Sequence, residues 1–130
     1  MLPVYDILTG WPPLAAMLQR GDEFAIYPEL ASEDSPLPFI IYAQTGKQPI
    51  QPLAGIPDAD FDNVGIDCWA AERDTAMTLA ETARDAFDHA RDGVRPWGYM
   101  QAGFSETFDA SARAWCVSFS WGLWTLRNIA

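Results

Sequence analysis

The sequence predicts a single α+β domain, residues 1–130, in which an antiparallel sheet of about four strands has helices packed on one face. Two patterns support this fold class. Residues Arg73 to Arg91 place apolar side chains at the i, i+3, i+4, i+7 spacing of one helical face, and most of them are alanine, which favours close approach to a sheet. Other segments are rich in β-branched and aromatic residues with the alternation typical of strands. A length of 130 residues, 49% of them hydrophobic, suits one core and argues against a second.

The N-terminal part predicts helices followed by a short strand. Residues Pro3 to Arg20 read as two short helical pieces, because Gly10 ends the first and the Pro12-Pro13 pair starts the second. Phe24 to Pro28 then predicts a short edge strand closed by proline. The acidic stretch that follows is expected to be a loop.

The middle of the chain predicts two strands separated by a long loop. Pro38 to Thr45 is apolar, β-branched and aromatic enough for a central strand, and Val64 to Ala70 alternates as a strand does. Between them, Gly46 to Asn63 concentrates proline, glycine and polar turn residues, which predicts a long loop.

After the long helix, which Gly93 ends, the sequence predicts an antiparallel hairpin. Its strands are Trp97 to Phe108 and Ala112 to Leu126, joined by a turn at Asp109 to Ser111. Alternation in the second strand places one apolar set on the face toward the helices: Trp115, Val117, Phe119, Trp121 and Leu123.

Composition excludes several classes of protein. The formal net charge of −10 would repel a phosphate backbone, so nucleic-acid binding is not expected. No stretch approaches the roughly 20 apolar residues of a membrane span, and no signal peptide is recognisable, so we expect synthesis in a cytoplasm and no membrane partner. Cys68 and Cys116 lie in strand-like apolar sequence, where we expect reduced, buried thiols.

No constellation of residues predicts catalysis, a metal or a cofactor. The single histidine, His89, falls on the polar face of the long helix without a nucleophile in motif context. Two cysteines lack the short paired spacing of a zinc site. The Asp58, Asp60, Asp62 run lacks the glycine and glutamate of a calcium loop, and no glycine-rich phosphate motif occurs. We therefore expect a protein that is not an enzyme.

Two sets of residues are candidates for contacts with other subunits or proteins. The long loop has apolar residues that would gain by docking, and its candidate contact residues are Lys47, Gln48, Ile50, Gln51, Leu53 and Ile56. Trp124 lies on the face opposite Trp115 and Trp121, so burying it requires something on the second face of the sheet. A neighbouring subunit could supply that cover, and the candidate subunit-interface residues are Trp124 and Trp69.

In this order and spacing, several segments resemble the tail-completion, or tail-terminator, proteins of long-tailed phages and gene transfer agents. The resemblance covers most of the chain, through Ile26-Tyr27-Pro28, Leu37 to Tyr42, Ile66 to Ala70 with the alanine-rich helix after it, and Val117 to Leu126. The sequence departs from the family pattern at Trp11-Pro12-Pro13, which breaks the first helix, and in the unusually high number of tryptophans in its C-terminal hairpin.

The resemblance implies a virion protein, assembled in the host cytoplasm, that forms a homohexameric ring on the head-proximal end of the tail tube. Its partners would be the tail tube protein and the head connector, with DNA passing through the lumen without specific binding. Two alternatives stay open. One is a small-ligand-binding or cyclase-like α+β domain, with Trp115, Phe119 and Trp121 lining a cavity. The other is a monomeric neck or adaptor protein of the same virion.

Overall fold

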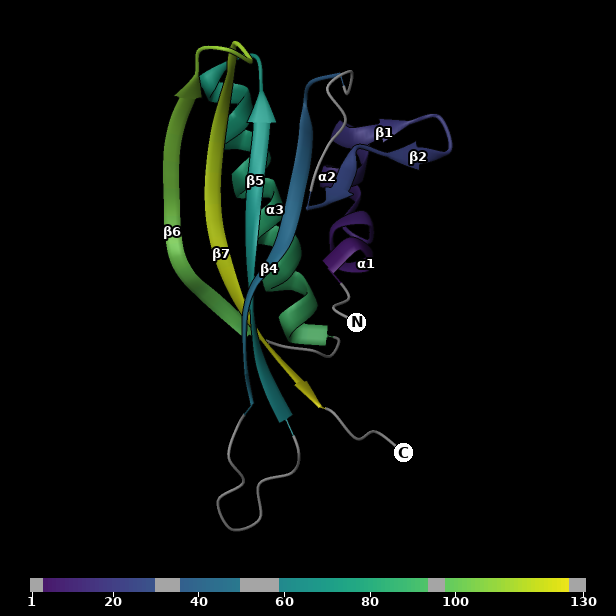
Figure 1. The fold of residues 1–130 in the computed structure, drawn as a ribbon. Coiled ribbons are helices and arrows are strands. Elements are labelled where there is room, and N and C mark those ends of the chain that lie inside the picture. The colour runs from purple at the N-terminus through teal and green to yellow at the C-terminus, as the bar shows by residue number, and fades with distance from the viewer. Residues whose placement is uncertain (1–3, 30–35, 50–58, 94–97, 127–130) are drawn as a thin grey trace.

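The computed structural model describes residues 4–29, 36–49, 59–93 and 98–126, with the backbone alone at 45–49, 59–62, 90–93, 98–102 and 123–126. Three helices and seven strands follow one another along the chain (Figure 1). In order they are α1 (Val4–Thr9), α2 (Pro12–Leu18), β1 (Gln19–Arg20), β2 (Glu23–Phe24), β3 (Ile26–Pro28), β4 (Phe39–Pro49), β5 (Ala59–Ala70), α3 (Arg73–Gly93), β6 (Gly98–Asp109) and β7 (Ala114–Leu126).

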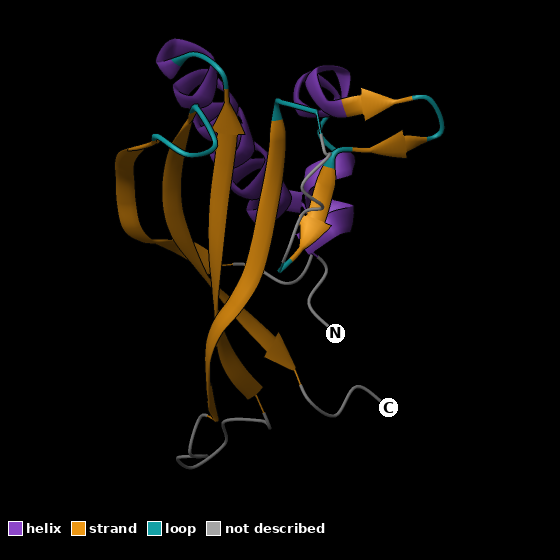
Figure 2. Cartoon of the chain, turned by 45° about the horizontal axis from the view of Figure 1, so that its top comes forward, coloured by secondary structure: helices purple, strands orange, loops and turns teal. Residues whose placement is uncertain are grey.

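The main sheet has five strands in the order β3-β4-β5-β7-β6, and the helices lie together on one of its faces (Figures 1 and 2). The α+β class and the one-sided helix layer are therefore confirmed. The sheet is mixed, however, and larger than the expected four antiparallel strands. Strand β3 runs parallel to β4, and every other neighbouring pair in this sheet is antiparallel.

Helix α3 forms where the apolar spacing predicts it, and it packs on the centre of the sheet. Its apolar face is fully buried, with Ala76, Leu79, Ala80 and Ala83 all 0% exposed. The opposite face, which includes Glu81, Asp85 and Asp88, is exposed. Because alanine ends at Cβ, the helix backbone can approach the sheet closely, and larger side chains then fill the remaining space.

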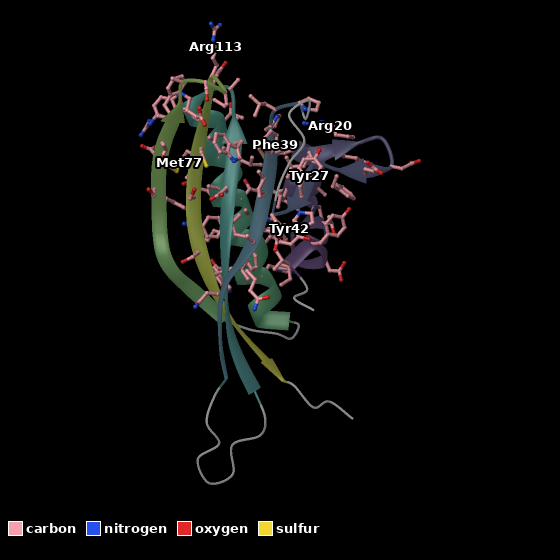
Figure 3. The ribbon with its side chains drawn as sticks, in the orientation of Figure 1. Arg20, Tyr27, Phe39, Tyr42, Met77 and Arg113 are labelled. Carbon is pink, nitrogen blue, oxygen red and sulfur yellow. The ribbon has the colours of Figure 1, made fainter. Side chains whose placement is uncertain are left out.

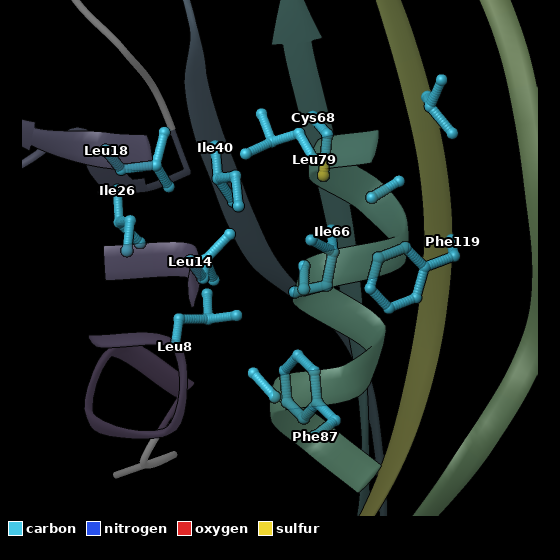
Figure 4. Close-up of a cluster of buried hydrophobic side chains, with 14 of the residues drawn as sticks. Leu8, Leu14, Leu18, Ile26, Ile40, Ile66, Cys68, Leu79, Phe87 and Phe119 are labelled. Carbon is cyan, nitrogen blue, oxygen red and sulfur yellow. The ribbon is translucent and has the colours of Figure 1, made fainter. Parts of the chain in front are cut away.

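Most of the core lies between α3, the N-terminal helices and the covered face of the sheet. Figure 4 shows leucines of α1 and α2 facing Ile40 of β4 and Ile66 of β5. At the α3–β7 contact, Phe87 stacks on Trp121 with ring centroids 5.1 Å apart and meets Phe119 edge-on at 6.4 Å. The predicted apolar face of the second hairpin strand is thus confirmed at Val117, Phe119 and Trp121, which are at most 3% exposed.

The segment Phe24 to Pro28, predicted as one edge strand, belongs to two different sheets. Phe24 lies in β2, which pairs only with β1 in a small separate hairpin, whereas Ile26 to Pro28 form β3. The chain bends at Ala25, which is 1% exposed. Its N–H donates to the carbonyl of Leu18 at 2.8 Å, and its own carbonyl accepts from the N–H of Ile40 at 2.9 Å. These tertiary hydrogen bonds, which local sequence does not show, hold the bend.

The prediction of a loop from Gly46 to Asn63 is wrong at both ends. Strand β4 continues to Pro49 and β5 begins at Ala59, so the two strands stay paired well beyond the expected boundary. A bulge between Gln44 and Gly46 leaves Thr45 unpaired, and the ladder resumes at Gly46, which pairs with Asn63. Pro49 stands at the strand end, where a missing N–H is tolerated. Residues 50–58 lie outside the described part of the chain.

The predicted C-terminal hairpin is confirmed, and an aspartate side chain holds its turn. The Asp109 Oδ1 atom accepts hydrogen bonds from the N–H groups of Ser111 at 3.0 Å and Ala112 at 3.1 Å, and from the Ser111 hydroxyl at 2.8 Å. The Ala112 N–H and the Ser111 hydroxyl are the main reasons why the pKa of this carboxyl is lowered from its usual 3.8.

Replacing Ala83 by leucine should destabilise the fold, because the added side chain has no space between α3 and the sheet. We expect a loss of about 1–3 kcal/mol in the free energy of unfolding. Glu81→Leu puts the same side chain on the exposed face of the same helix and should change stability by less than about 0.5 kcal/mol. Urea denaturation of both variants measures the difference. Equal losses would contradict close packing of the alanine face.

Replacing Asp109 by asparagine should remove a contribution to stability that depends on pH. The carboxyl has a lowered pKa in the fold, so its ionised form stabilises the fold above its usual pKa of 3.8, and this contribution is lost as pH falls through the lower folded value. Wild type should therefore be more stable than Asp109→Asn near neutral pH, and the two should converge in acid. Thermal unfolding across that pH range measures this, and a constant gap would disprove it.

Candidate functional site

The face of the main sheet opposite the helices, here the open face, has no layer over it in the described part of the chain (Figures 1 and 2). Alternation along β5 separates the two faces. Val64, Ile66 and Cys68 are 0% exposed and point to the helices, whereas Asp67 and Trp69 are half-buried on the open face. A half-buried, uncovered surface of this kind is available for contacts with another molecule.

Aromatic side chains cross the open face from β3 through β4 to β5. The ring centroids of Tyr27 and Phe39 lie 6.0 Å apart, and those of Phe39 and Trp69 lie 6.4 Å apart in a stacked arrangement. Figure 3 labels Tyr27 and Phe39 on their neighbouring strands. The indole Nε1 of Trp69 is buried and has no hydrogen-bond partner among the described residues. These three rings form a continuous aromatic strip, and the indole N–H of Trp69 is an unsatisfied hydrogen-bond donor within it.

Next to this strip, a polar cluster joins β5 to β7. The Ser118 hydroxyl donates to Asp67 Oδ1 at 2.7 Å. Since its only proton is used there, the Ser118 oxygen accepts from the Cys116 thiol, whose sulfur lies 3.4 Å away. Ladder pairing of Asp67 with Ser118 brings these residues together although they are 51 positions apart.

Neither cysteine is suited to act as a nucleophile. Both are free; Cys68 lies in the core and Cys116 on the open face. Burial raises the pKa of the Cys116 thiol and raises that of Cys68 well above its usual range. Both thiols are therefore protonated at neutral pH, and it is the thiolate that reacts or binds a metal.

His89 is exposed on α3, as its place on the polar helix face predicts. Its ring packs against Trp11, with centroids 4.7 Å apart, so it joins α3 to the N-terminal segment. Within the described residues, no group of three or more His, Cys, Asp or Glu side chains is arranged to hold a metal ion. Of the helices in that same part of the chain, none has both the length and the apolar character to cross a membrane.

The predicted contact residues are divided between two parts of the sheet. Lys47 and Gln48 belong to β4, where it extends past the end of α3 together with β5 and β7 (Figure 1). Gln48 and Trp124 both pair with Phe61, so they share one rung at this projecting end. The side chains of these residues lie outside the described set, as do the predicted contact residues Ile50, Gln51, Leu53 and Ile56 altogether. Trp69 lies near the other end of β5, on the open face.

Sequence reasoning selected Trp69 as a candidate contact residue but did not select its neighbours. The alternation of Val64 to Ala70 puts Trp69 and Asp67 opposite the apolar face, yet nothing local indicates that Phe39 and Ser118 stand beside them. Those neighbours follow from the register, which pairs Trp69 with Phe39 on one side and Asp67 with Ser118 on the other. Cross-strand contacts of this kind need the tertiary fold to be seen.

Two of the three side chains that a ligand-binding domain would use make ring contacts in the core. Phe119 packs against Phe104 at 5.5 Å as well as Phe87, and Trp121 stacks on Phe87. These contacts occupy space in which the small-ligand alternative places a bound molecule, and they favour a surface role for the protein. The third side chain, Trp115, is half-buried, and its ring centroid lies 5.3 Å from that of the exposed Phe108.

No protein-family model matches the sequence, and no curated protein sequence matches it. Among solved structures, the chain is similar to one chain of a structure titled "Virion of native gene transfer agent (GTA) particle", with a TM-score of 0.63 and 17% sequence identity. The match covers 95% of this chain and 92% of that one. At this identity the likeness concerns the fold, which the two chains share over almost their whole lengths.

Replacing Ser118 by alanine should destabilise the protein by about 1–2 kcal/mol, because Asp67 loses its half-buried hydrogen-bond donor. Ser120→Ala is the matched control. Ser120 lies two residues further along β7 on the same face, and its hydroxyl has no hydrogen bond within the described residues. Its loss should change stability by less than about 0.5 kcal/mol. Chemical denaturation of both variants measures this difference in stability. Equal midpoints would rule out a structural role for the Asp67–Ser118 hydrogen bond.

Proposed function

We propose that this chain is a structural, non-enzymatic subunit of a phage-like or gene transfer agent particle and acts there as the tail terminator. It would form a homohexameric ring on the head-proximal end of the tail tube, stop tube polymerisation, and join the tube to the head connector. The observation that supports this most is the fold shared with a chain of a gene transfer agent virion over 95% of this chain and 92% of that one. This shared fold agrees with the sequence resemblance to the tail-terminator family, which rests on the order and spacing of several segments along the chain.

The shape of the sheet supports a role in contacting a tube. Strands β4, β5 and β7 continue past the end of α3, so they form a projecting end that the chain's own helices do not cover (Figure 1). A fold needs no such extension to complete its core. Lys47 and Gln48 belong to this end, and the connecting residues 50–58 continue from it, which makes it the surface that we assign to the tail tube protein.

The charge of the chain supports passage of DNA without specific binding. Six copies at −10 each would carry about −60, which repels phosphates and opposes adhesion to the wall of a conduit. The same charge also keeps free subunits soluble. Reversing acidic residues that line the lumen would then slow ejection of DNA while leaving ring assembly intact.

The function can be tested by removing the connection between β4 and β5. Because Pro49 pairs with Asp60, two glycines can replace residues 50–58 while the ladder remains. We expect an unchanged midpoint of unfolding and loss of tail-length control, seen as overlong or uncapped tails in electron micrographs of particles assembled with this variant.

A second variant replaces residues 50–58 by a glycine–serine linker of the same length. It separates the contribution of the side chains from that of loop length, and we expect it to fail as the deletion does. Tails of normal length with both variants would refute a role of this end in capping. Tails of normal length in particles that lack the protein altogether would refute the terminator function itself.

A further inference from the structure

Arg113, in the turn between β6 and β7, differs from the other arginines whose side chains the structure describes. Among the four arginine side chains that the structure describes, it alone has neither an ion pair nor a hydrogen bond. Arg20 donates to the carbonyl of Pro38, Arg73 pairs with Glu106 at 2.8 Å, and Arg84 pairs with Asp85 at 3.3 Å. Figure 3 shows the Arg113 side chain pointing away from the body of the molecule. Its backbone is in the left-handed region, with φ 52°.

The surroundings of Arg113 have the composition of a contact surface. Phe108 is 49% exposed, the more exposed of the two large apolar side chains that are exposed among the described residues, and it lies against Trp115. The ladder places Phe108 and Trp115 within two rungs of the turn that carries Arg113. We call these three residues the hairpin end. An exposed phenylalanine, a half-buried tryptophan and an unpaired arginine are side chains of the kinds enriched in protein interfaces.

The opposite side of the subunit carries a complementary surface. The β1–β2 hairpin projects from the side of the molecule away from β6, and Asp22 and Glu23 form its acidic tip (Figures 1 and 2). Both residues are exposed and have no ion pair within the described part of the chain. The neighbouring Arg20 pairs with Glu23 in the β1–β2 ladder but makes no ion pair with it or with Asp22 in the described part of the chain, since its guanidinium donates to the carbonyls of Gln19 and Pro38.

The two surfaces lie on opposite sides of one subunit, toward the same end of the molecule, and one chain cannot bring its own acidic tip to its own hairpin end (Figure 1). Two different complementary patches of this kind are what a head-to-tail contact requires, and repeated rotation closes such contacts into a ring. We propose that the acidic tip of one subunit docks on the hairpin end of the next copy of this chain, with Arg113 meeting Asp22 and Glu23. The proposal rests on the ring proposed above and names the contact that builds it.

Charge reversal on each side tests the contact in the full-length chain. Arg113→Glu, and separately the pair Asp22→Lys with Glu23→Lys, should each weaken self-association by at least about tenfold, because like charges then face each other. Sedimentation of the chain alone and in the presence of tail tube protein measures this. Glu81→Lys, which reverses an exposed charge on α3, should leave association unchanged.

The strongest evidence would come from mixing the two reversed variants. In an alternating ring, the copy that carries Arg113→Glu meets the lysine tip of its neighbour, and the neighbour's own Arg113 meets an unmodified acidic tip, so both contacts are attractive again. An equimolar mixture should therefore assemble as wild type does. Arg113→Gly removes the side chain and suits the left-handed backbone, so it should unfold no earlier than wild type and still associate more weakly.

Assembly of either reversed variant as strong as that of wild type would overturn this contact while leaving the ring in place. Failure of the mixture to restore assembly would overturn it as well. A wild-type chain that stays monomeric both alone and with tail tube protein would overturn the ring and the contact together. Rings that respond to the charges as expected but do not control tail length would support the contact and count against the proposed function.

Discussion

Close packing of the alanine face of α3 on the sheet is the constraint on which the rest of the structure depends. Three of the four fully buried residues in the middle of this face, Ala76, Ala80 and Ala83, end at Cβ, so the helix axis can lie near β5 and β7. Phe87 then reaches far enough to meet aromatic rings from β7. The short helices α1 and α2 pack beside α3 and extend the same layer over β4 and β3. One helix thus determines which face of the sheet is covered.

Placing all helices on one face has a consequence for the other. The open face carries an aromatic strip ending at Trp69 and a polar cluster around Asp67, and neither is covered within the described chain. In the same way, β4, β5 and β7 are longer than the helix layer that supports them. The chain therefore completes its own core and still has sheet surface available for contacts with another molecule.

Electrostatics sets limits on how copies of this chain can meet. A net charge of −10 opposes association in general, and a contact that brings a local positive charge to a local negative one offsets part of this repulsion. Three of the four described arginine side chains belong to α3 and the β6–β7 hairpin, and two of these three are already paired. Arg113 is the remaining one, while exposed acids stand at the β1–β2 tip. Such an unequal distribution favours contact between unlike sides of neighbouring subunits over contact between like sides.

The sequence by itself determined the helices, the C-terminal hairpin and the one-sided core, because periodicity in α3 and alternation in β7 report directly which side chains are buried. Only the tertiary structure decided the bend at Ala25, the parallel pairing of β3 with β4, and the extension of β4 and β5 through a segment whose glycine and prolines indicate a loop. In these places hydrogen bonds to distant strands outweigh local preference. The same holds for the surfaces. Alternation places Trp69 on the face opposite the core, but its contact with Phe39 and the separation of Arg113 from the acidic tip follow from the tertiary arrangement of the strands, which no local pattern encodes.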